Sequence, residues 1–269
     1  MQAFKNPPYV WLISGCSSGF GRELALKALS MGDFVGVSSR KVEDVKDICN
    51  KYPETSAAIT LDVTKKQDIN QAIEMVTKTF GGLDIVVNNA GYIWHSAIHN
   101  MTDEQWDAMI DIHVSAQFRV LRAYGRWLRK VANKESEIRK VVNISSTMGL
   151  HGGATQLAYS AGKAAVVGLT RTLAKEWGRF NVTVNAVAFG AIDTRLTSPY
   201  EKEPNISIVK GKERKVGLSY EQIEQASLAS PLGRIGTPED AANAIYLLCS
   251  PESNWITGEV LLASGGVRS

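Results

Sequence analysis

Cysteine is scarce in this sequence of 269 residues, which contains only Cys16, Cys49 and Cys249. An odd number of cysteines so far apart excludes a disulfide-stabilised scaffold and a cysteine-based zinc site. Histidine is scarce too, and the spacing of the four histidines is not that of metal ligands. We therefore expect no metal site.

An excess of charge of one sign is also missing, since 30 Lys and Arg face 27 Asp and Glu, a net charge of +3. So mild and even a charge is not typical of a nucleic-acid-binding protein. Long hydrophobic runs are missing as well: the longest uncharged stretch, 141–162, is rich in glycine, serine and asparagine and is no membrane span. The first residues lack the pattern of a secretion signal. We expect a cytoplasmic protein that binds neither nucleic acid nor a membrane.

The sequence does contain short apolar runs that alternate with longer amphipathic segments along its whole length. The runs are unbroken rather than alternating, which is typical of parallel strands buried on both faces. Strand–helix alternation of this kind predicts right-handed βαβ units and an α/β fold. Strands are predicted at 9–14, 34–38, 57–60, 83–88, 140–144, 182–187 and 259–263, and helices at 20–31, 42–51, 66–80, 103–130, 157–178, 220–229 and 238–248.

No boundary divides the chain, so we expect one domain over residues 1–269. The one long irregular region is polar, lies at about 195–235, and is interrupted by prolines and glycines. Irregular segments of this length in a single domain are usually functional. We interpret this one as a substrate flap.

A glycine-rich turn follows the first predicted strand and opens the first predicted helix, from Gly15 to Gly21. Gly15 permits a tight turn, while Gly19 and Gly21 let the backbone approach a pyrophosphate at the helix N-terminus. The position between a strand and a helix is typical of a dinucleotide-binding unit.

A second pattern is the pair Tyr159 and Lys163, which are four residues apart and share one face of a predicted helix. A phenol has an ordinary pKa of ~10 and is a poor acid–base group at neutral pH. A neighbouring ammonium favours the phenolate and lowers that pKa. The spacing is common by itself, so it gains meaning only from Ser146, which follows the fifth predicted strand.

With further motifs, these patterns resemble the short-chain dehydrogenase/reductase family, and in particular its 3-oxoacyl-carrier-protein-reductase-like branch. The glycine turn has that family's spacing, Gly-x-x-x-Gly-x-Gly, and the resemblance covers nearly the whole chain in the right order. It implies a Rossmann-type fold, a single domain with a doubly wound parallel sheet of seven strands flanked by helices. The matching segments are 15–21, 62–63, 88–91, Ser146, 159–163, 185–190 with Thr194, and 233–240.

The resemblance also implies a role for each residue of the site. Ser146, rather than its neighbour Ser145, would polarise a substrate carbonyl, Tyr159 would donate the proton, and Lys163 would lower the pKa of Tyr159 and bind the nicotinamide ribose. The assigned catalytic residues are Ser146, Tyr159, Lys163 and His113, and the assigned cofactor-binding residues are Gly15, Ser17, Ser18, Gly19, Phe20, Gly21, Ser39, Arg40, Asp62, Val63, Asn89, Ala90, Gly91, Tyr159, Lys163, Gly190, Ile192 and Thr194.

The choice of cofactor depends on the end of the second strand. An acid there would bind the 2′-hydroxyl of NAD and repel a 2′-phosphate. This chain has Ser39 at that place, followed by Arg40, whose planar donors suit a phosphate. Arg40 could instead be an ordinary surface cation. We expect NADP(H).

Three positions depart from the family. His113 stands where the family has an asparagine that supports a helix irregularity and a water link to the lysine. The imidazole either takes over this role, with a loss of activity in the mildly acidic range unless burial moves its pKa, or is a packed core residue. Phe189 replaces a proline at the nicotinamide pocket, and Ser264 replaces an acid.

We therefore expect an NADPH-dependent oxidoreductase that reduces a small ketone or aldehyde, or oxidises the matching secondary alcohol. His113 and Phe189 leave one alternative open, a cyclase or isomerase that uses bound NADP(H) without net redox chemistry. A second alternative of another class is a non-catalytic nucleotide-sensing protein, against which the intact Ser146, Tyr159 and Lys163 argue. The basic run at 210–215 could bind an acidic carrier or be a solvated loop. The resemblance implies a homodimer or homotetramer, with subunit contacts on helices that carry Trp106, Phe118, Trp127 and Trp177. Substrate-pocket residues are expected at Tyr92, Trp94, His95, Met148, Leu150 and His151.

Overall fold

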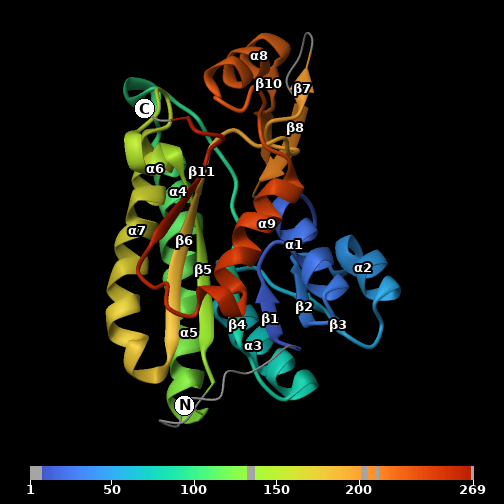
Figure 1. The fold of residues 1–269 in the computed structure, drawn as a ribbon. Helices are drawn as coiled ribbons and strands as arrows, with labels where there is room; N and C mark the ends of the chain where they lie inside the picture. Colours follow the sequence, from blue (N-terminus) through green and yellow to red (C-terminus); the bar gives the residue numbers. More distant parts are fainter. Residues whose placement is uncertain (1–7, 132–136, 201–204, 210–211, 268–269) are drawn as a thin grey trace.

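Seven parallel strands form one sheet in the computed structural model, which describes residues 8–131, 137–200, 205–209 and 212–267 (Figure 1). Their order across the sheet is β11-β6-β5-β4-β1-β2-β3, so the chain winds outward from β1 in one direction and from β4 in the other. The predicted doubly wound sheet is confirmed. The strands are β1 (Val10–Ile13), β2 (Phe34–Ser39), β3 (Ser56–Thr60), β4 (Ile85–Asn88), β5 (Arg139–Ser146), β6 (Val182–Phe189) and β11 (Val260–Ala263).

Helices cover both faces of this sheet, because successive residues of each strand point to opposite sides. In β1, Trp11 and Ile13 belong to the core beneath α1, α2 and α9, whereas Val10 and Leu12 belong to the core beneath α3, α5 and α7. The helices are α1 (Gly19–Ser30), α2 (Lys46–Lys51), α3 (Lys66–Phe80), α4 (Asp103–Ile110), α5 (Ala116–Val131), α6 (Thr147–His151), α7 (Leu157–Trp177), α8 (Tyr220–Ala229) and α9 (Pro238–Cys249). Short 3₁₀ turns lie at Val42–Val45, Ile98–Asn100, Gly178–Phe180 and Pro251–Ser253.

The long helix predicted over 103–130 is interrupted in the structure. One turn of π-helix, Asp111–Ser115, separates α4 from α5 and carries His113. A π-turn inserts one residue into a helix and is frequent at functional sites. The apolar pattern before and after such a turn is still helical, which is why periodicity alone predicts one continuous helix.

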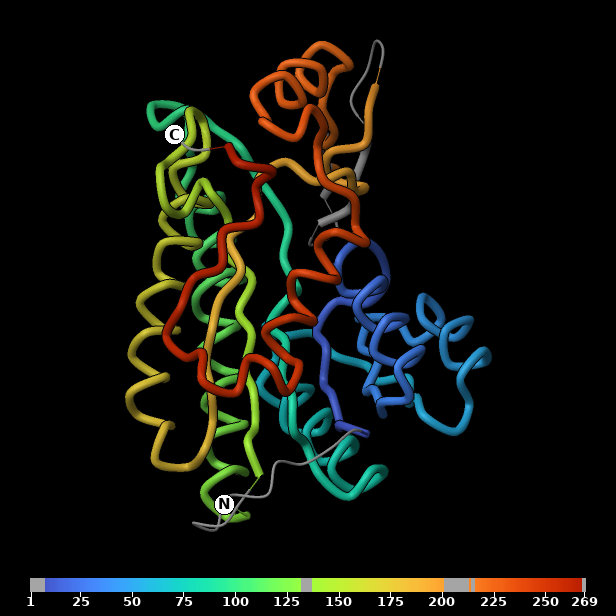
Figure 2. Tube along the Cα trace, in the orientation of Figure 1, coloured from blue at the N-terminus to red at the C-terminus, as the bar shows by residue number. Residues whose placement is uncertain are grey.

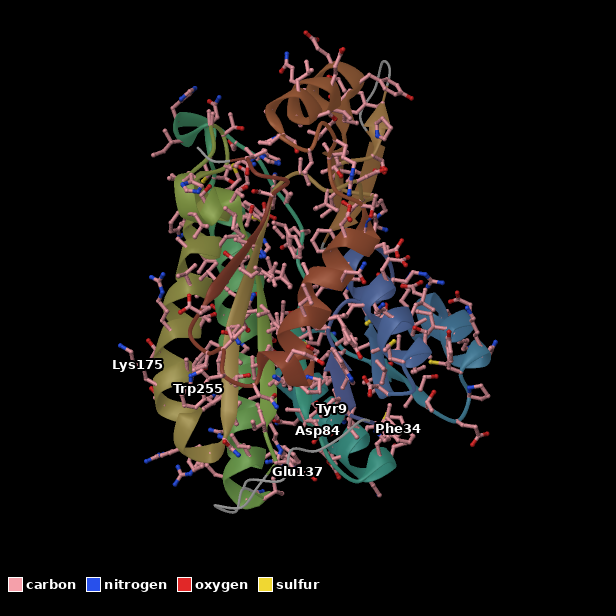
Figure 3. The ribbon with its side chains drawn as sticks, viewed as in Figure 1. Tyr9, Phe34, Asp84, Glu137, Lys175 and Trp255 are labelled. Carbon is pink, nitrogen blue, oxygen red and sulfur yellow. The ribbon has the colours of Figure 1, made fainter. Side chains whose placement is uncertain are left out.

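Two buried carboxylates hold the amino end of the sheet. Asp33 accepts hydrogen bonds from the backbone N–H of Tyr9 at 2.8 Å and from Nε1 of Trp11 at 2.9 Å, and Asp84 accepts one from the backbone N–H of Val10 at 2.8 Å. Figure 3 labels Tyr9 and Asp84 close to each other at this end, far from the carboxyl ends of the strands. These bonds fix the position of the first residues of β1. They therefore also fix where the last residue of the strand lies at the opposite edge of the sheet.

The segment expected to be irregular, about 195–235, contains strands before its helix α8. β7 (Pro199–Tyr200) pairs in parallel with β10 (Leu218–Ser219), and β8 (Asn205–Val209) pairs with β9 (Lys212–Val216) as an antiparallel hairpin. In Figure 2 this orange segment stands beyond the carboxyl ends of the sheet. The alternation of apolar and polar residues in β8 covers only five residues and has charged neighbours, so sequence periodicity does not reveal this strand. Residues 210–211 of the basic run lie outside the described residues.

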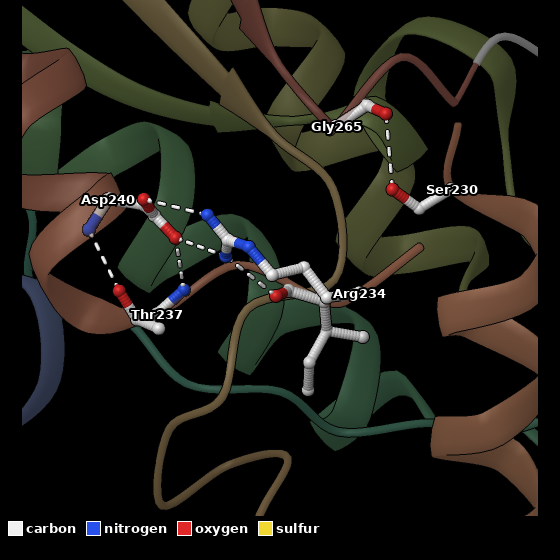
Figure 4. A network of polar contacts seen from close by, with 6 residues as sticks. Ser230, Arg234, Thr237, Asp240 and Gly265 are labelled. Atoms are coloured by element: carbon white, nitrogen blue, oxygen red, sulfur yellow. Dashed lines mark hydrogen bonds and ion pairs between the residues drawn. The ribbon is translucent and has the colours of Figure 1, made fainter. Parts of the chain in front are cut away.

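The carboxyl end of this segment is tied to the body of the domain (Figure 4). Arg234 donates two hydrogen bonds to Asp240, at 2.6 and 3.2 Å, and thereby lowers the pKa of that carboxyl to about 2. Asp240 also accepts from the backbone N–H of Thr237 at 2.8 Å, completing the cap of α9. Ser230 Oγ donates to the carbonyl of Gly265 at 3.1 Å. These contacts anchor the flap where it returns to α9 and β11.

Candidate functional site

A cavity lies at the carboxyl edge of the sheet, where β1 and β4 are neighbours and the winding direction reverses. In open α/β sheets this switch point is where ligands bind. The cavity is lined by every residue assigned above to cofactor binding or catalysis, with the exception of Gly21. Loops after six successive strands, β1 to β6, therefore bring together residues that are far apart in the sequence.

The glycine-rich turn is interlocked with the loop after β4. The hydroxyl of Ser14 donates to the carbonyl of Val87 at 3.2 Å and accepts from the backbone N–H of Asn89 and Ala90 at 2.9 and 3.1 Å. The amide of Asn89 in turn donates to the carbonyls of Ser14 and Gly15 at 2.9 and 3.1 Å. This exchange holds both loops as one rigid floor.

The glycines of the turn serve different needs. Gly15 and Gly19 have φ values of +76° and +59°, which other residues rarely adopt. Gly21 has an ordinary φ, but a Cβ there would collide with the carbonyl oxygen of Gly15 and lie 2.5 Å from Nδ2 of Asn89. Gly21 packs beneath the turn and does not line the cavity, so its expected approach to a pyrophosphate stays a prediction. The helix cap Ser18 makes no side-chain bond to the first amides of α1, which leaves them available to an anion.

The end of the cavity where the adenosine is expected is formed by the loops after β2 and β3. Asp62 accepts from the backbone N–H and the hydroxyl of Thr64 at 3.0 and 2.7 Å, so its carboxylate is held in a fixed turn. Ser39 is buried and Arg40 is exposed. Asp44 also lines this end and was missed, although its place just after Arg40 in the sequence was a usable signal.

Ser146, Tyr159 and Lys163 lie together deeper in the cavity. Burial raises the pKa of Tyr159, and a hydrogen bond with Ser146 partly offsets this. Nζ of Lys163 lies 5.7 Å from the centre of the Tyr159 ring and donates to the carbonyl of Ile144 at 2.8 Å. Burial lowers the pKa of Lys163 to about 7. Burial is the first cause of the shifted pKa in both groups, and the expectation that Lys163 lowers the pKa of Tyr159 stays a prediction.

The two neighbouring serines have different partners. Ser145 is buried, and its hydroxyl donates to the backbone carbonyl of Lys163 at 2.9 Å, which ties the end of β5 to α7. Ser146 is the last residue of β5 and the cap of α6, and its hydroxyl accepts from the backbone N–H of Met148 at 3.2 Å while bonding to Tyr159. Of the two serines, Ser146 is the one whose hydroxyl can contact the same oxygen atom of a bound molecule as the hydroxyl of Tyr159.

His113 is 1% exposed and packs edge-on against Tyr159, with ring centres 5.1 Å apart. Its Nε2 lies 2.8 Å from the carbonyl of Tyr92, so this nitrogen donates, while Nδ1 has no partner among the described residues. Burial, with the charge of Lys163 second, lowers the pKa of His113 well below its ordinary value. The ring is therefore neutral, and the inflection expected in the mildly acidic range moves to lower pH.

For the remaining residues the structure agrees with the sequence-based expectation at some positions and differs at others. Tyr92 lines the cavity, but among the described residues that do so Trp94, His95, Met148, Leu150 and His151 are not found. Phe189 lines it and packs against Phe20 with ring centres 4.8 Å apart, in the position where a proline was expected. Residues missed by sequence reasoning include Thr64, Arg195, Leu196 and Thr197, and for the last three no signal beyond closeness to Thr194 was available.

Comparisons with known proteins agree with this geometry. The family model described as enoyl-(acyl carrier protein) reductase matches residues 15–268. The 3-oxoacyl-[acyl-carrier-protein] reductase of Thermotoga maritima is 34% identical, covering 96% of this chain and 97% of its own. A crystal structure of 3-ketoacyl-(acyl-carrier-protein) reductase from Brucella melitensis complexed with NADH has a TM-score of 0.81 at 25% identity, covering 96% and 97% of the two chains. The structure of ElxO with NADP bound has a TM-score of 0.80 at 28% identity, covering 97% and 99%.

The buried lysine makes a prediction about stability. Between the lowered pKa of about 7 and the ordinary 10.5, the unfolded chain holds a proton on Lys163 that the folded chain has released. The contribution of this group to the free energy of unfolding therefore rises with pH in that window. Lys163→Met removes the titration, so the stability of the parent relative to the variant should increase by about 2 kcal/mol from about pH 7 to pH 9.

Urea denaturation of both proteins without cofactor at a series of pH values measures this. Other groups titrate alike in the two proteins and cancel in the difference. A difference in the free energy of unfolding that does not change with pH would show that Lys163 keeps an ordinary pKa in the fold.

Proposed function

The chain belongs to the short-chain dehydrogenase/reductase family and is an NAD(P)-dependent oxidoreductase acting on CH–OH or C=O groups, and we propose that it reduces a ketone or aldehyde with NADPH, or oxidises the matching secondary alcohol. The observation that carries this proposal is the meeting of Ser146, Tyr159 and Lys163 in the cavity that begins at the glycine-rich turn. The Thermotoga relative is a 3-oxoacyl-[acyl-carrier-protein] reductase, so a 3-oxoacyl thioester is the first substrate to assay.

The residues present fit a dinucleotide. The open amides at the start of α1 and the positive φ values of Gly15 and Gly19 suit a pyrophosphate. At one end Asp62 and Val63 would hold the adenine, and at the other Ile192 and Thr194 would hold the carboxamide. The nicotinamide ring, when bound, supplies or accepts the hydride.

The protein contributes orientation and a proton. The hydroxyls of Ser146 and Tyr159, which are hydrogen-bonded to each other, would both contact the carbonyl oxygen of the substrate. Tyr159 would donate the proton in the direction of reduction. With a pKa of about 7, Lys163 can carry a positive charge at neutral pH, and it would stabilise the phenolate that remains. His113 would hold the Tyr159 ring through the edge-on contact.

The two alternatives are not favoured. A cyclase or isomerase that uses bound NADP(H) without net redox chemistry is disfavoured by the relatives, which are named as reductases. A non-catalytic nucleotide sensor would require none of Ser146, Tyr159 and Lys163. The neutral, packed state of His113 weakens one of the two departures that suggested the cyclase or isomerase.

We also infer that the subunits associate as a homodimer or homotetramer. A groove between α5 and α7 is lined by apolar and by charged, mainly basic, side chains, and Phe118, at 47% exposed, is open to a partner there. Trp177, by contrast, is buried against Tyr124 and Gly125 within its own subunit, so its role is in the core. No helix among the described residues has both the length and the apolar character needed to cross a membrane. A cytoplasmic location stays a prediction.

NADPH should bind at least tenfold more tightly than NADH, because Arg40 supplies a charge to the 2′-phosphate and Ser39 leaves room for it. A tenfold ratio corresponds to about 1.4 kcal/mol, which is modest for a charge-assisted contact. Titration calorimetry of parent and Arg40→Ala tests this: the variant should lose affinity for NADPH and keep its affinity for NADH. Equal affinities in the parent would contradict the assignment.

Tyr159→Phe should lower kcat by about 10²-fold or more, because it deletes the hydroxyl that donates the proton. The fold and cofactor binding should be kept. Tyr124→Phe is a matched control, since its buried hydroxyl has no partner among the described residues and lies outside the cavity. A Tyr159→Phe variant that retained more than about a tenth of the parent rate would argue against acid catalysis by this residue.

His113→Asn tests the state of the imidazole. Because its pKa is well below the ordinary value, the ring should stay neutral from about pH 6 to pH 9, and the ratio of parent to variant kcat should be constant over that range. At neutral pH, kcat of the variant should equal or exceed that of the parent. If only the parent lost activity in the mildly acidic range, the imidazole would titrate near its ordinary pKa; a large loss in the variant at all pH values would assign the ring a further role.

A further inference from the structure

A carboxylate stands at the end of the cavity that receives the adenosine ribose. Asp44 lies in the 3₁₀ turn Val42–Val45, five residues beyond the serine that occupies the usual place of an acid. It lines the same cavity as Ser39, Arg40 and Asp62. Ser39 and Arg40 favour NADP(H), but the negative charge of Asp44 lies at the same end of the cavity.

The position of Asp44 is fixed by the end of β2. The hydroxyl of Ser39, which is 4% exposed, donates to Oδ2 of Asp44 at 3.2 Å. The same hydroxyl oxygen accepts from the backbone N–H of Lys41 at 3.4 Å, and the backbone N–H of Asp44 donates to the carbonyl of Lys41 at 3.1 Å. The proton of Ser39 is therefore already used. One carboxylate oxygen of Asp44 is held beside the strand end, while the other accepts no hydrogen bond from the described residues.

The charge of Asp44 is not neutralised by its neighbours. Among the described residues neither Asp44 nor Arg40 forms an ion pair. Other cations lie nearby, but Lys46 is paired with Glu43, and Arg22 is paired with Asp47 while donating only to the backbone carbonyl of Asp44 at 3.5 Å. A cation and an anion thus stand unpaired on one rim of the cavity.

We propose that Asp44 is a specificity-determining residue that limits the preference for NADP(H). Its free carboxylate oxygen accepts a hydrogen bond from a ribose 2′-hydroxyl and repels a 2′-phosphate, while Arg40 attracts that phosphate. The two side chains act in opposite directions on the same ribose, so the protein keeps a usable affinity for NAD(H). This inference rests on the proposed function, because it requires a nicotinamide dinucleotide in this cavity.

Asp44→Asn is the direct test, because the amide keeps the size of the side chain and an oxygen for Ser39 but removes the charge. Calorimetric Kd values for NADP⁺ and NAD⁺ should show NADP⁺ binding at least about fivefold tighter than in the parent, and NAD⁺ binding unchanged or weaker. The gain for NADP⁺ should shrink as salt rises, since exposed charges are screened.

Glu43→Gln is the matched control. It makes the same change of charge one residue earlier, on an exposed side chain that pairs with Lys46 and does not line the cavity. Both Kd values should change less than about twofold, since an exposed charge outside the cavity is screened. A second variant, Asp44→Ser, repeats the test if the asparagine perturbs folding, which circular dichroism and Tm would reveal.

An Asp44→Asn protein that binds both dinucleotides in the parental ratio would overturn this inference and leave the proposed function intact. An equal change in Glu43→Gln would also overturn it, since the effect would then come from general charge. A parent protein that bound neither dinucleotide would overturn the proposed function and this inference with it.

Discussion

The site depends on one structural exchange, the hydrogen bonds between the loops after β1 and β4. Ser14 and Asn89 each bond to the other loop, so two strands that are neighbours in the sheet but distant in the sequence end in one rigid floor. Every other contribution to the cavity is placed relative to this floor: α1 starts from it, His113 fits beside Gly91, and Tyr159 reaches over it from α7. Because the bonds join backbone groups to the buried Ser14 and the half-buried Asn89, the floor cannot shift without losing several of them together.

Burial governs the chemistry of the deeper half of the cavity. Lys163 and His113 are buried and Tyr159 is half-buried, and in each case burial is the first cause of the shifted pKa: upward for the phenol, downward for the ammonium and the imidazole. Each charged form is thus disfavoured in the fold. A phenol that keeps its proton is suited to donate it. A lysine with a pKa of about 7 can gain a proton when the phenolate forms. The same burial costs stability, which is a common condition of active sites.

The sequence predicts the framework well because its signals are redundant. Seven apolar runs, the glycine spacing and Tyr159 with Lys163 all indicate one topology, and each agrees with the others. The features that sequence reasoning missed depend on tertiary contacts. The π-turn around His113 leaves the helical pattern intact on both sides; the packing role of Gly21 exists only once Asn89 lies above it; and Asp44 looks like any surface acid until Ser39 binds it.

The exchange of the family's asparagine for His113 shows how a cavity tolerates a larger residue at a sensitive position. The ring needs space, and the two backbones beside it are glycines: a Cβ on Gly91 would lie 2.8 Å from Cε1 of His113, and one on Gly162 would lie 3.0 Å from its Cβ. It also needs to avoid a second positive charge beside Lys163, and burial keeps it neutral. A neutral imidazole that donates to the carbonyl of Tyr92 preserves the charge and the donor of an amide while adding an aromatic edge against Tyr159. The substitution therefore conserves the electrostatics of the site and changes its packing.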